Sequence, residues 1–323
     1  MHHSIPAWFE FATIGVLVAL LLADVFMISR RPHVPSTKES ALWVGFYATL
    51  ALLFAATIWL TSGIDRASEF VAGWLTEYSL SVDNLFVFVI IMARFAVPKK
   101  YQQEVLMVGI VMSLVLRAVF IFAGVAILNA FTGIFYLFGA FLIYTAIHQL
   151  VRTEDDEEES ESKLTKFLSK RIAYTETYEG MKIRTNVDGK RTFTPIIVVF
   201  ITLALTDVMF AFDSIPAIFG ITTDAFVVLT ANIFALMGLR QLYFLLGNLI
   251  EKLRFLEYGI SAILAFIGFK LVAHAMHENE LPFINGGKHI EWAPEISTNT
   301  SLIVIVVCIA VSAGASLIIK KKD

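Results

Sequence analysis

Long apolar stretches recur along this sequence, and each is long enough to cross a lipid bilayer as an α-helix. About 20 helical residues span a hydrocarbon core of about 30 Å. Nine stretches are present, with approximate limits 7–29, 40–61, 69–93, 103–128, 131–151, 195–217, 223–247, 255–275 and 299–319. The chain is 57% hydrophobic and only 16% charged, unlike a water-soluble domain. We therefore expect an all-α polytopic membrane protein with about nine transmembrane helices.

The uneven distribution of basic residues between these stretches predicts an orientation. The connections after the first, third and seventh stretches each carry at least two Lys or Arg, whereas those after the second, fourth, sixth and eighth carry one or none. By the positive-inside rule, the N-terminus lies outside and the C-terminus, which contains Lys320 to Lys322, is cytoplasmic. We expect a multi-pass protein of the cell inner (plasma) membrane. Its first stretch lacks a basic n-region and a cleavage motif, so it is expected to remain as a helix.

Composition also excludes several classes of function. The basic residues form no continuous stripe, so the expected partner is the lipid bilayer and not a nucleic acid. The single cysteine, Cys308, provides neither a disulfide framework nor a thiolate metal cluster. The sequence contains no phosphate-binding P-loop and no GxGD element of intramembrane aspartyl proteases, so no enzymatic activity is expected.

An internal repeat is the most informative pattern. Leu75-Thr76-Glu77 followed by Asp83-Asn84 recurs with identical spacing as Leu205-Thr206-Asp207 followed by Asp213-Ser214. Two further blocks agree: Leu116 to Gly124 matches Leu239 to Gly247, and Ala140 to His148 parallels Ala262 to Lys270. Each copy holds three apolar stretches, an odd number, so the second copy enters the membrane from the opposite face. The sequence therefore predicts an inverted-topology repeat of three plus three helices.

The repeat divides the chain into five parts. These are two N-terminal transmembrane helices (1–68), the first repeat (69–151), a cytoplasmic loop (152–194), the second, inverted repeat (195–275), and an outer loop with a C-terminal helix (276–323). The loop opens with the acidic run Glu154 to Glu159, which we interpret as a solvated linker.

Charged residues inside the apolar stretches point to a functional site. Seven lie away from the ends of their stretches: Glu77, Asp83, Arg117, Asp207, Asp213, Arg240 and Lys270. Each would cost about 2.5–3.5 kcal/mol if it faced lipid unpaired. The four acids must therefore face the protein interior, where they pair with the cations, bind an ion or take up protons.

The spacing within each motif leaves two arrangements open. Glu77 and Asp83 are six residues apart, about 9 Å along a helix and rotated by roughly 240°, so one straight helix cannot aim both at one point. Either the helix unwinds locally, which Ser79, Ser81, Pro216 and Gly220 would ease, or each copy contributes one acid to a central site and the other to an access path. We favour a site to which both repeats contribute oxygen ligands.

Carboxylate, carboxamide and hydroxyl oxygens are ligands for hard cations such as Mg²⁺, Ca²⁺ and Mn²⁺, and four carboxylates favour a divalent ion. The candidate metal ligands are Glu77, Asp83, Asn84, Asp207, Asp213 and Ser214, with Arg117, Arg240, Lys270 and Asn232 as supporting residues. Asn232 has no counterpart in the first copy, where Gly109 stands, and could be a ligand or an interhelical hydrogen-bond partner. The alternative is that the acids form buried salt bridges that fix helix packing.

These motifs resemble those of the TerC/Alx family of bacterial membrane proteins. The resemblance rests on Glu77 to Asn84, on Asp207 to Phe219 and on Thr222 to Arg240, and it extends from the first stretch through the eighth. Two positions depart from the family pattern. Tyr78 stands where some relatives have lysine, and His148 stands where the first repeat usually has a lysine matching Lys270.

The resemblance implies a role in manganese homeostasis. It leads us to expect export of Mn²⁺ from the cytoplasm by alternating access around a mid-membrane carboxylate site, with Ca²⁺ or Mg²⁺ as other possible cargo. The alternative is a non-transporting assembly or metal-loading partner of the secretion machinery, with tellurium-ion resistance as an indirect phenotype.

Overall fold

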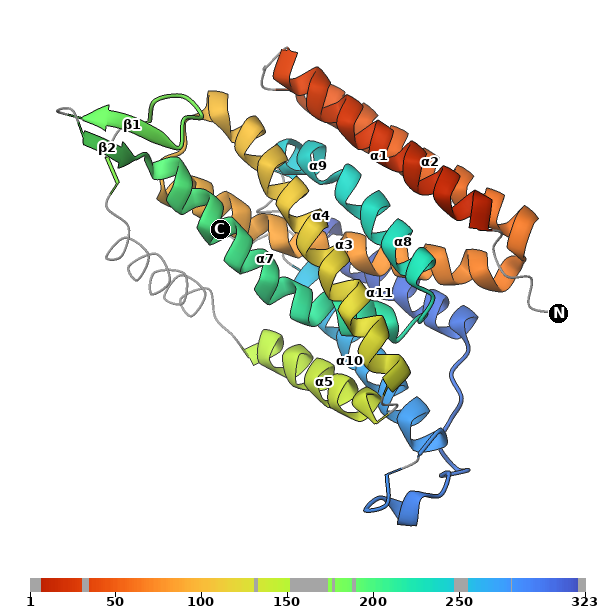
Figure 1. The fold of residues 1–323 in the computed structure, drawn as a ribbon. Coiled ribbons are helices and arrows are strands. Elements are labelled where there is room, and N and C mark those ends of the chain that lie inside the picture. The colour runs from red at the N-terminus through yellow and green to blue at the C-terminus, as the bar shows by residue number, and fades with distance from the viewer. Residues whose placement is uncertain are drawn as a thin grey trace.

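The computed structural model describes residues 7–30, 35–130, 133–151, 174–175, 178–187, 190–246, 255–279 and 281–318. Its helices are α1 (Ala7–Arg30), α2 (Thr37–Ser62), α3 (Ile64–Arg94), α4 (Lys99–Ala130), α5 (Ile134–Val151), α7 (Pro195–Phe219), α8 (Ala225–Met237), α9 (Leu239–Leu246), α10 (Leu256–His277) and α11 (Thr298–Ile318). A short 3-10 helix, η2 (Asn285–Gly287), lies between α10 and α11. The strands β1 (Arg184–Val187) and β2 (Lys190–Phe193) form an antiparallel hairpin that projects from one end of the bundle (Figure 1).

The predicted all-α polytopic membrane architecture is confirmed. Eight helical segments in the described part of the chain are long and apolar enough to cross a membrane, counting α8 and α9 as one. The first predicted stretch, 7–29, is the helix α1, but its described apolar part, Trp8–Leu21, is shorter than a full span. The five-part division of the chain and the inverted relation of the repeats stay predictions.

Local sequence explains where several helices begin. The side chain of Ser36 accepts a hydrogen bond from the backbone N–H of Glu39 and caps α2, and that of Asp224 accepts bonds from Phe226 and Val227 and caps α8. Pro195 opens α7, where its missing N–H leaves no helical hydrogen bond unmade. The Asp224 cap fixes the point at which the chain turns back into the bundle.

The helices α3, α4, α7 and α8 form the centre of the bundle. α3 packs against α8 and α7, and α4 packs against the same two helices. Outside this group, α5 lies against α10, α11 against α10 and α3, and α2 against α3 and α9. The central group places the acidic motifs of α3 and α7 in the interior.

The helices α3 and α7 run in opposite directions. At one end of the bundle, Thr222, just beyond α7, donates a hydrogen bond of 2.8 Å to Glu69 near the start of α3. We call this the Arg66 end. At the other, the hairpin end, the hydroxyl of Tyr178 donates to the carbonyl of Phe95 at the close of α3 (2.7 Å). Glu77 and Asp207 therefore lie at similar depths, near the middle of their helices.

Neither acidic motif interrupts its helix. Ser79 donates its hydroxyl proton to the carbonyl of Leu75 (2.8 Å), and Pro216 lies in the last turn of α7, so α3 and α7 stay helical through their acids. The interruption lies instead at Gly238, which divides the predicted stretch 223–247 into α8 and α9. Local unwinding at the acids, the first of the two arrangements, is therefore absent from these two helices.

Candidate functional site

A buried cluster of three charged side chains lies at the centre of the bundle. Glu77 of α3 is 0% exposed, Arg117 of α4 is 1% exposed and Asp207 of α7 is 4% exposed. Nη1 of Arg117 lies 2.5 Å from Oε2 of Glu77, and its Nε lies 3.7 Å from Oδ1 of Asp207. Ser113, one turn before Arg117, donates a 2.7 Å hydrogen bond to the same Oδ1. We call Glu77, Arg117 and Asp207 the central triad.

In the described structure, each carboxylate of the central triad has one oxygen atom without a hydrogen-bond donor. Within the described part of the chain, Oε1 of Glu77, Oδ2 of Asp207 and Nε of Arg117 are buried without a hydrogen-bond partner. An unsatisfied buried polar atom is costly, and for charged groups the cost is larger. Two carboxylates against one guanidinium also leave a formal charge of −1. The triad is therefore suited to receive a cation.

Further polar groups surround the triad. Asn84, Ser81 and Ser113 line a cavity of about 10 Å³ together with Arg117 and Asp207. This volume is close to the minimum that holds one water molecule. The rest of its lining consists of apolar residues of α3, α4, α8 and α9.

Two further candidate residues have buried, unsatisfied side chains. Asn232 of α8 is 1% exposed, and its side chain is close enough to Glu77 to interact with the carboxylate. Neither atom of its amide, however, makes a hydrogen bond of ordinary geometry among the described residues. Ser214 of α7 is buried, and its hydroxyl likewise has no partner within the described structure.

The second acid of α7 lies apart from the triad. Asp213 is partly buried and accepts a hydrogen bond of 3.2 Å from the hydroxyl of Thr145 on α5. His148, one turn further along α5, interacts electrostatically with it. Asp83, the second acid of α3, lies within the helix, but its side chain is outside the described part of the structure. One acid of α7 thus faces the centre and the other faces α5, and the assignment of Asp213 to an access path stays a prediction.

The other supporting cations, Arg240 and Lys270, line other cavities. Arg240 lies two residues after the break at Gly238. It is buried and lines an apolar pocket between α1, α4 and α8. Lys270 of α10 is partly buried and faces a larger cavity at the Arg66 end. No group of three or more His, Cys, Asp or Glu side chains positioned to hold a metal ion occurs among the residues that the structure describes.

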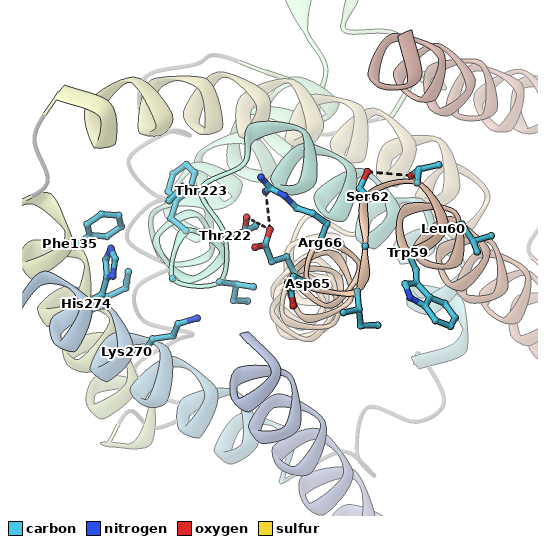
Figure 2. Close-up of a pocket in the computed structure, with 18 residues that line it drawn as sticks. Trp59, Leu60, Ser62, Asp65, Arg66, Phe135, Thr222, Thr223, Lys270 and His274 are labelled. Carbon is cyan, nitrogen blue, oxygen red and sulfur yellow. Dashed lines mark hydrogen bonds and ion pairs between the residues drawn. The ribbon is translucent and has the colours of Figure 1, made fainter. Parts of the chain in front are cut away.

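A cavity of about 870 Å³ opens at the Arg66 end, and we call it the vestibule. Figure 2 shows Arg66, Thr222, Lys270 and His274 around it, from α3, the connection after α7, and α10. Arg66 lies 3.1 Å from Glu69 and 2.8 Å from Asp224, so that one guanidinium joins two carboxylates here as well. Unlike Arg117, Arg66 is 28% exposed.

A tightly packed apolar layer lies between the vestibule and the triad. Gly73 of α3 lies one turn after Glu69 and one turn before Glu77. A Cβ atom at Gly73 would lie 3.3 Å from the Ile218 side chain and 3.5 Å from that of Ala231. This layer separates the two polar regions.

Sequence reasoning missed the hydroxyl donors and the ion pairs of the vestibule. Ser113 lies four residues before Arg117, a spacing that places both on one helix face. It could have been found once Arg117 was assigned to the interior. Thr145 and Arg66 carried no comparable signal, because Thr145 has no polar counterpart in the second repeat and Arg66 lies outside both repeats.

Comparisons with known proteins place the chain among membrane proteins. Residues 62–323 match the family described as "Integral membrane protein TerC family". An uncharacterized membrane protein of Mycobacterium tuberculosis (strain CDC 1551 / Oshkosh) is 39% identical over 308 residues, covering 94% of this chain and 77% of the relative. A Salmonella typhi protein named "Putative membrane-bound redox modulator Alx" is 39% identical over 274 residues, covering 82% and 84%. A protein of the same name from Escherichia coli (strain K12) is 39% identical over 275 residues, covering 82% and 85%. No solved structure matches the chain.

Proposed function

This chain belongs to the TerC family of integral membrane proteins, and we propose that it exports a divalent cation, Mn²⁺, from the cytoplasm through the carboxylates of its central triad. The observation that carries the proposal is the pair of buried carboxylates, one from α3 and one from α7, that share a single guanidinium and retain unsatisfied oxygens. Oxygen donors of this kind prefer hard divalent cations. The amide of Asn232 and the hydroxyl of Ser113 add uncharged donors nearby.

The packing of the helices supports alternating access. α3 of the first repeat packs against α8 of the second, and α7 of the second packs against α4 of the first. This reciprocal exchange is the relation expected of two inverted copies that rock against each other around a central site. The apolar layer at Gly73 would close the path to the vestibule in one state and open it in another.

Export of a dication requires an external source of free energy. Moving one charge through the membrane potential involves about 2.3 kcal/mol per 100 mV, and an inside-negative potential opposes the exit of Mn²⁺. Since the sequence has no P-loop, we propose that the entry of another ion drives export. Asp213 accepts a hydrogen bond from Thr145 and not from the triad. We propose that its carboxylate lines the path of Mn²⁺ or of the coupled ion.

Redox chemistry is less compatible with this chain. Two relatives carry a name that refers to redox modulation. A thiol–disulfide couple within one chain needs two cysteines, and this chain has one, Cys308. An effect of this chain on cellular redox balance would therefore act through the transported metal.

Transport of radioactive Mn²⁺ into inverted membrane vesicles tests the proposal. We expect saturable uptake that is lost in the double variant Glu77→Gln, Asp207→Asn, because two neutral amides offer no charge to the ion. The matched control is Glu257→Gln, which removes an exposed helix acid in the first turn of α10. Unchanged uptake in the double variant would remove the triad from the mechanism.

The same vesicles separate transport from an assembly role. Absence of uptake by the wild-type protein, together with stable co-purification of secretion-machinery subunits, would favour the non-transporting alternative. Competition by Ca²⁺ and Mg²⁺ in the uptake assay establishes which divalent ion the site selects.

A further inference from the structure

We propose that Arg117 is a tethered competitor cation that makes the central site selective for divalent over monovalent ions. In this arrangement the guanidinium occupies the carboxylates when cargo is absent, and an arriving ion must displace it. A divalent ion can do so and a monovalent ion cannot. The inference rests on the proposed function, because it assumes that Glu77 and Asp207 receive the cargo.

The contacts of Arg117 place it where a cation would bind. Its Nη1 contacts Oε2 of Glu77 at 2.5 Å and its Nε lies 3.7 Å from Oδ1 of Asp207. The remaining carboxylate oxygens, Oε1 and Oδ2, have no hydrogen-bond partner among the described residues. Any cation that binds both carboxylates must share them with this guanidinium or replace it.

Charge arithmetic gives the selectivity. A guanidinium stays protonated at all physiological pH values, so it can leave the carboxylates only by moving. A monovalent ion that replaces it gains one unit of attraction to each carboxylate and loses the same amount. A divalent ion gains two units for each one lost, because Coulomb energy is proportional to charge. The arginine has a further advantage over a free monovalent ion, because it is covalently attached and its concentration next to the carboxylates does not depend on the solution.

Asp207 has a second hydrogen-bond donor besides Arg117. Ser113 holds Oδ1 of Asp207 at 2.7 Å, independently of the arginine. Arg117 and Asp207 both line the cavity of about 10 Å³, which is close to the volume of one water molecule. A purely structural ion pair would have no need of a second carboxylate with a free oxygen at the same cation.

Equilibrium binding of Mn²⁺ to the purified full-length protein, measured by isothermal titration calorimetry, tests the inference. Titrations are made in KCl and in choline chloride at equal ionic strength, so that only K⁺ can enter a small site. For the wild type we expect the same Mn²⁺ affinity in both salts. In choline chloride we expect Arg117→Gln to bind Mn²⁺ about tenfold or more tightly than the wild type does. In KCl we expect this binding to weaken, because K⁺ then competes for the carboxylates.

Two controls isolate the charge at this position. Arg117→Lys keeps a tethered cation and should behave as the wild type with respect to K⁺. Arg66→Gln removes the arginine that joins Glu69 and Asp224 in the vestibule, an equivalent charge pattern that water reaches, and should also leave binding insensitive to K⁺.

A further variant keeps the test valid if Arg117→Gln does not fold. The double variant Glu77→Gln, Arg117→Gln removes both partners of the 2.5 Å ion pair and leaves only the Asp207 charge, so the formal charge stays at −1. We expect K⁺ to weaken Mn²⁺ binding to this variant. Insensitivity to K⁺ in both arginine-free variants would overturn the inference, as would weaker Mn²⁺ binding in Arg117→Gln. Absence of Mn²⁺ binding to the wild type would instead refute the proposed function.

Discussion

The close contact between α5 and α10 makes the stability of the protein sensitive to a single added methyl group. The two helices approach through Gly139 and Gly268, which face each other. A Cβ atom at Gly139 would lie 2.7 Å from the carbonyl oxygen of Gly268 and 3.0 Å from the backbone N of Val272. A Cβ atom at Gly268 would lie 2.8 Å from the carbonyl oxygen of Gly139. Replacing either glycine with alanine therefore forces backbone against backbone.

The distances set the size of the effect. Ordinary contact for a Cβ atom begins at 3.4 Å, so Gly139→Ala requires the helices to separate by about 0.7 Å from the 2.7 Å contact. Overpacking of this kind costs about 1–3 kcal/mol, and we expect about 2 kcal/mol because backbone atoms cannot rotate away. One separation relieves both clashes. The double variant Gly139→Ala, Gly268→Ala should therefore cost less than the sum of the single variants.

Reversible unfolding in mixed detergent micelles, followed by circular dichroism, measures these free energies. The matched control is Gly45→Ala in α2, where an added Cβ atom meets nothing within 4 Å. The control should remain within about 0.5 kcal/mol of the wild type. If Gly139→Ala were as stable as Gly45→Ala, or if the two α5–α10 substitutions were additive, the close-approach argument would be wrong.

Two further predictions concern the ends of the bundle. Asp224→Ala should cost about 1 kcal/mol in the same unfolding assay, because α8 loses its cap, whereas Asp224→Asn keeps a good cap and should cost less, although it loses the ion pair with Arg66. Equal costs would show that the ion pair and not the cap matters. At the hairpin end, burial and the neighbouring Tyr174 raise the pKa of Tyr178 to about 12. Docking of its hydroxyl on Phe95 should therefore persist below about pH 10, the usual tyrosine pKa, and be lost as the pH rises toward 12. Tyrosinate absorbance of the wild type minus that of Tyr178→Phe measures this, and a difference curve centred near pH 10 would contradict it.

The membrane architecture could be predicted from sequence because it follows from local composition. A stretch of about 20 apolar residues has few alternatives to a membrane-spanning helix, since lipid offers no hydrogen-bond partners to the backbone. The predicted stretches and the helices coincide closely, as 195–217 does with α7. The family resemblance was equally accessible, because the two acidic motifs are long and repeated.

The pairing within the site could not be predicted, because it depends on how helices rotate about their axes. Spacing showed that Glu77 and Asp83 cannot meet at one point, but it could not say which acid faces the centre. In the structure Glu77 and Asp207 face Arg117, and Asp213 faces Thr145. These choices are set by contacts between helices far apart in the sequence.

The position of the helix break shows why local signals can mislead in a membrane. Ser79 and Pro216 suggested unwinding at the acids, yet the hydroxyl of Ser79 bonds back to its own helix and Pro216 lies where α7 already ends. An unwound segment next to Glu77 would also expose backbone groups that compete with the ion for its carboxylate. A break at Gly238 avoids this, because it lies between α8 and α9, on a segment that carries neither acid, two residues before Arg240. Uninterrupted helices hold Glu77 and Asp207 in place, and the alternating access that we propose would draw its backbone freedom from the break at Gly238, a residue without a side chain.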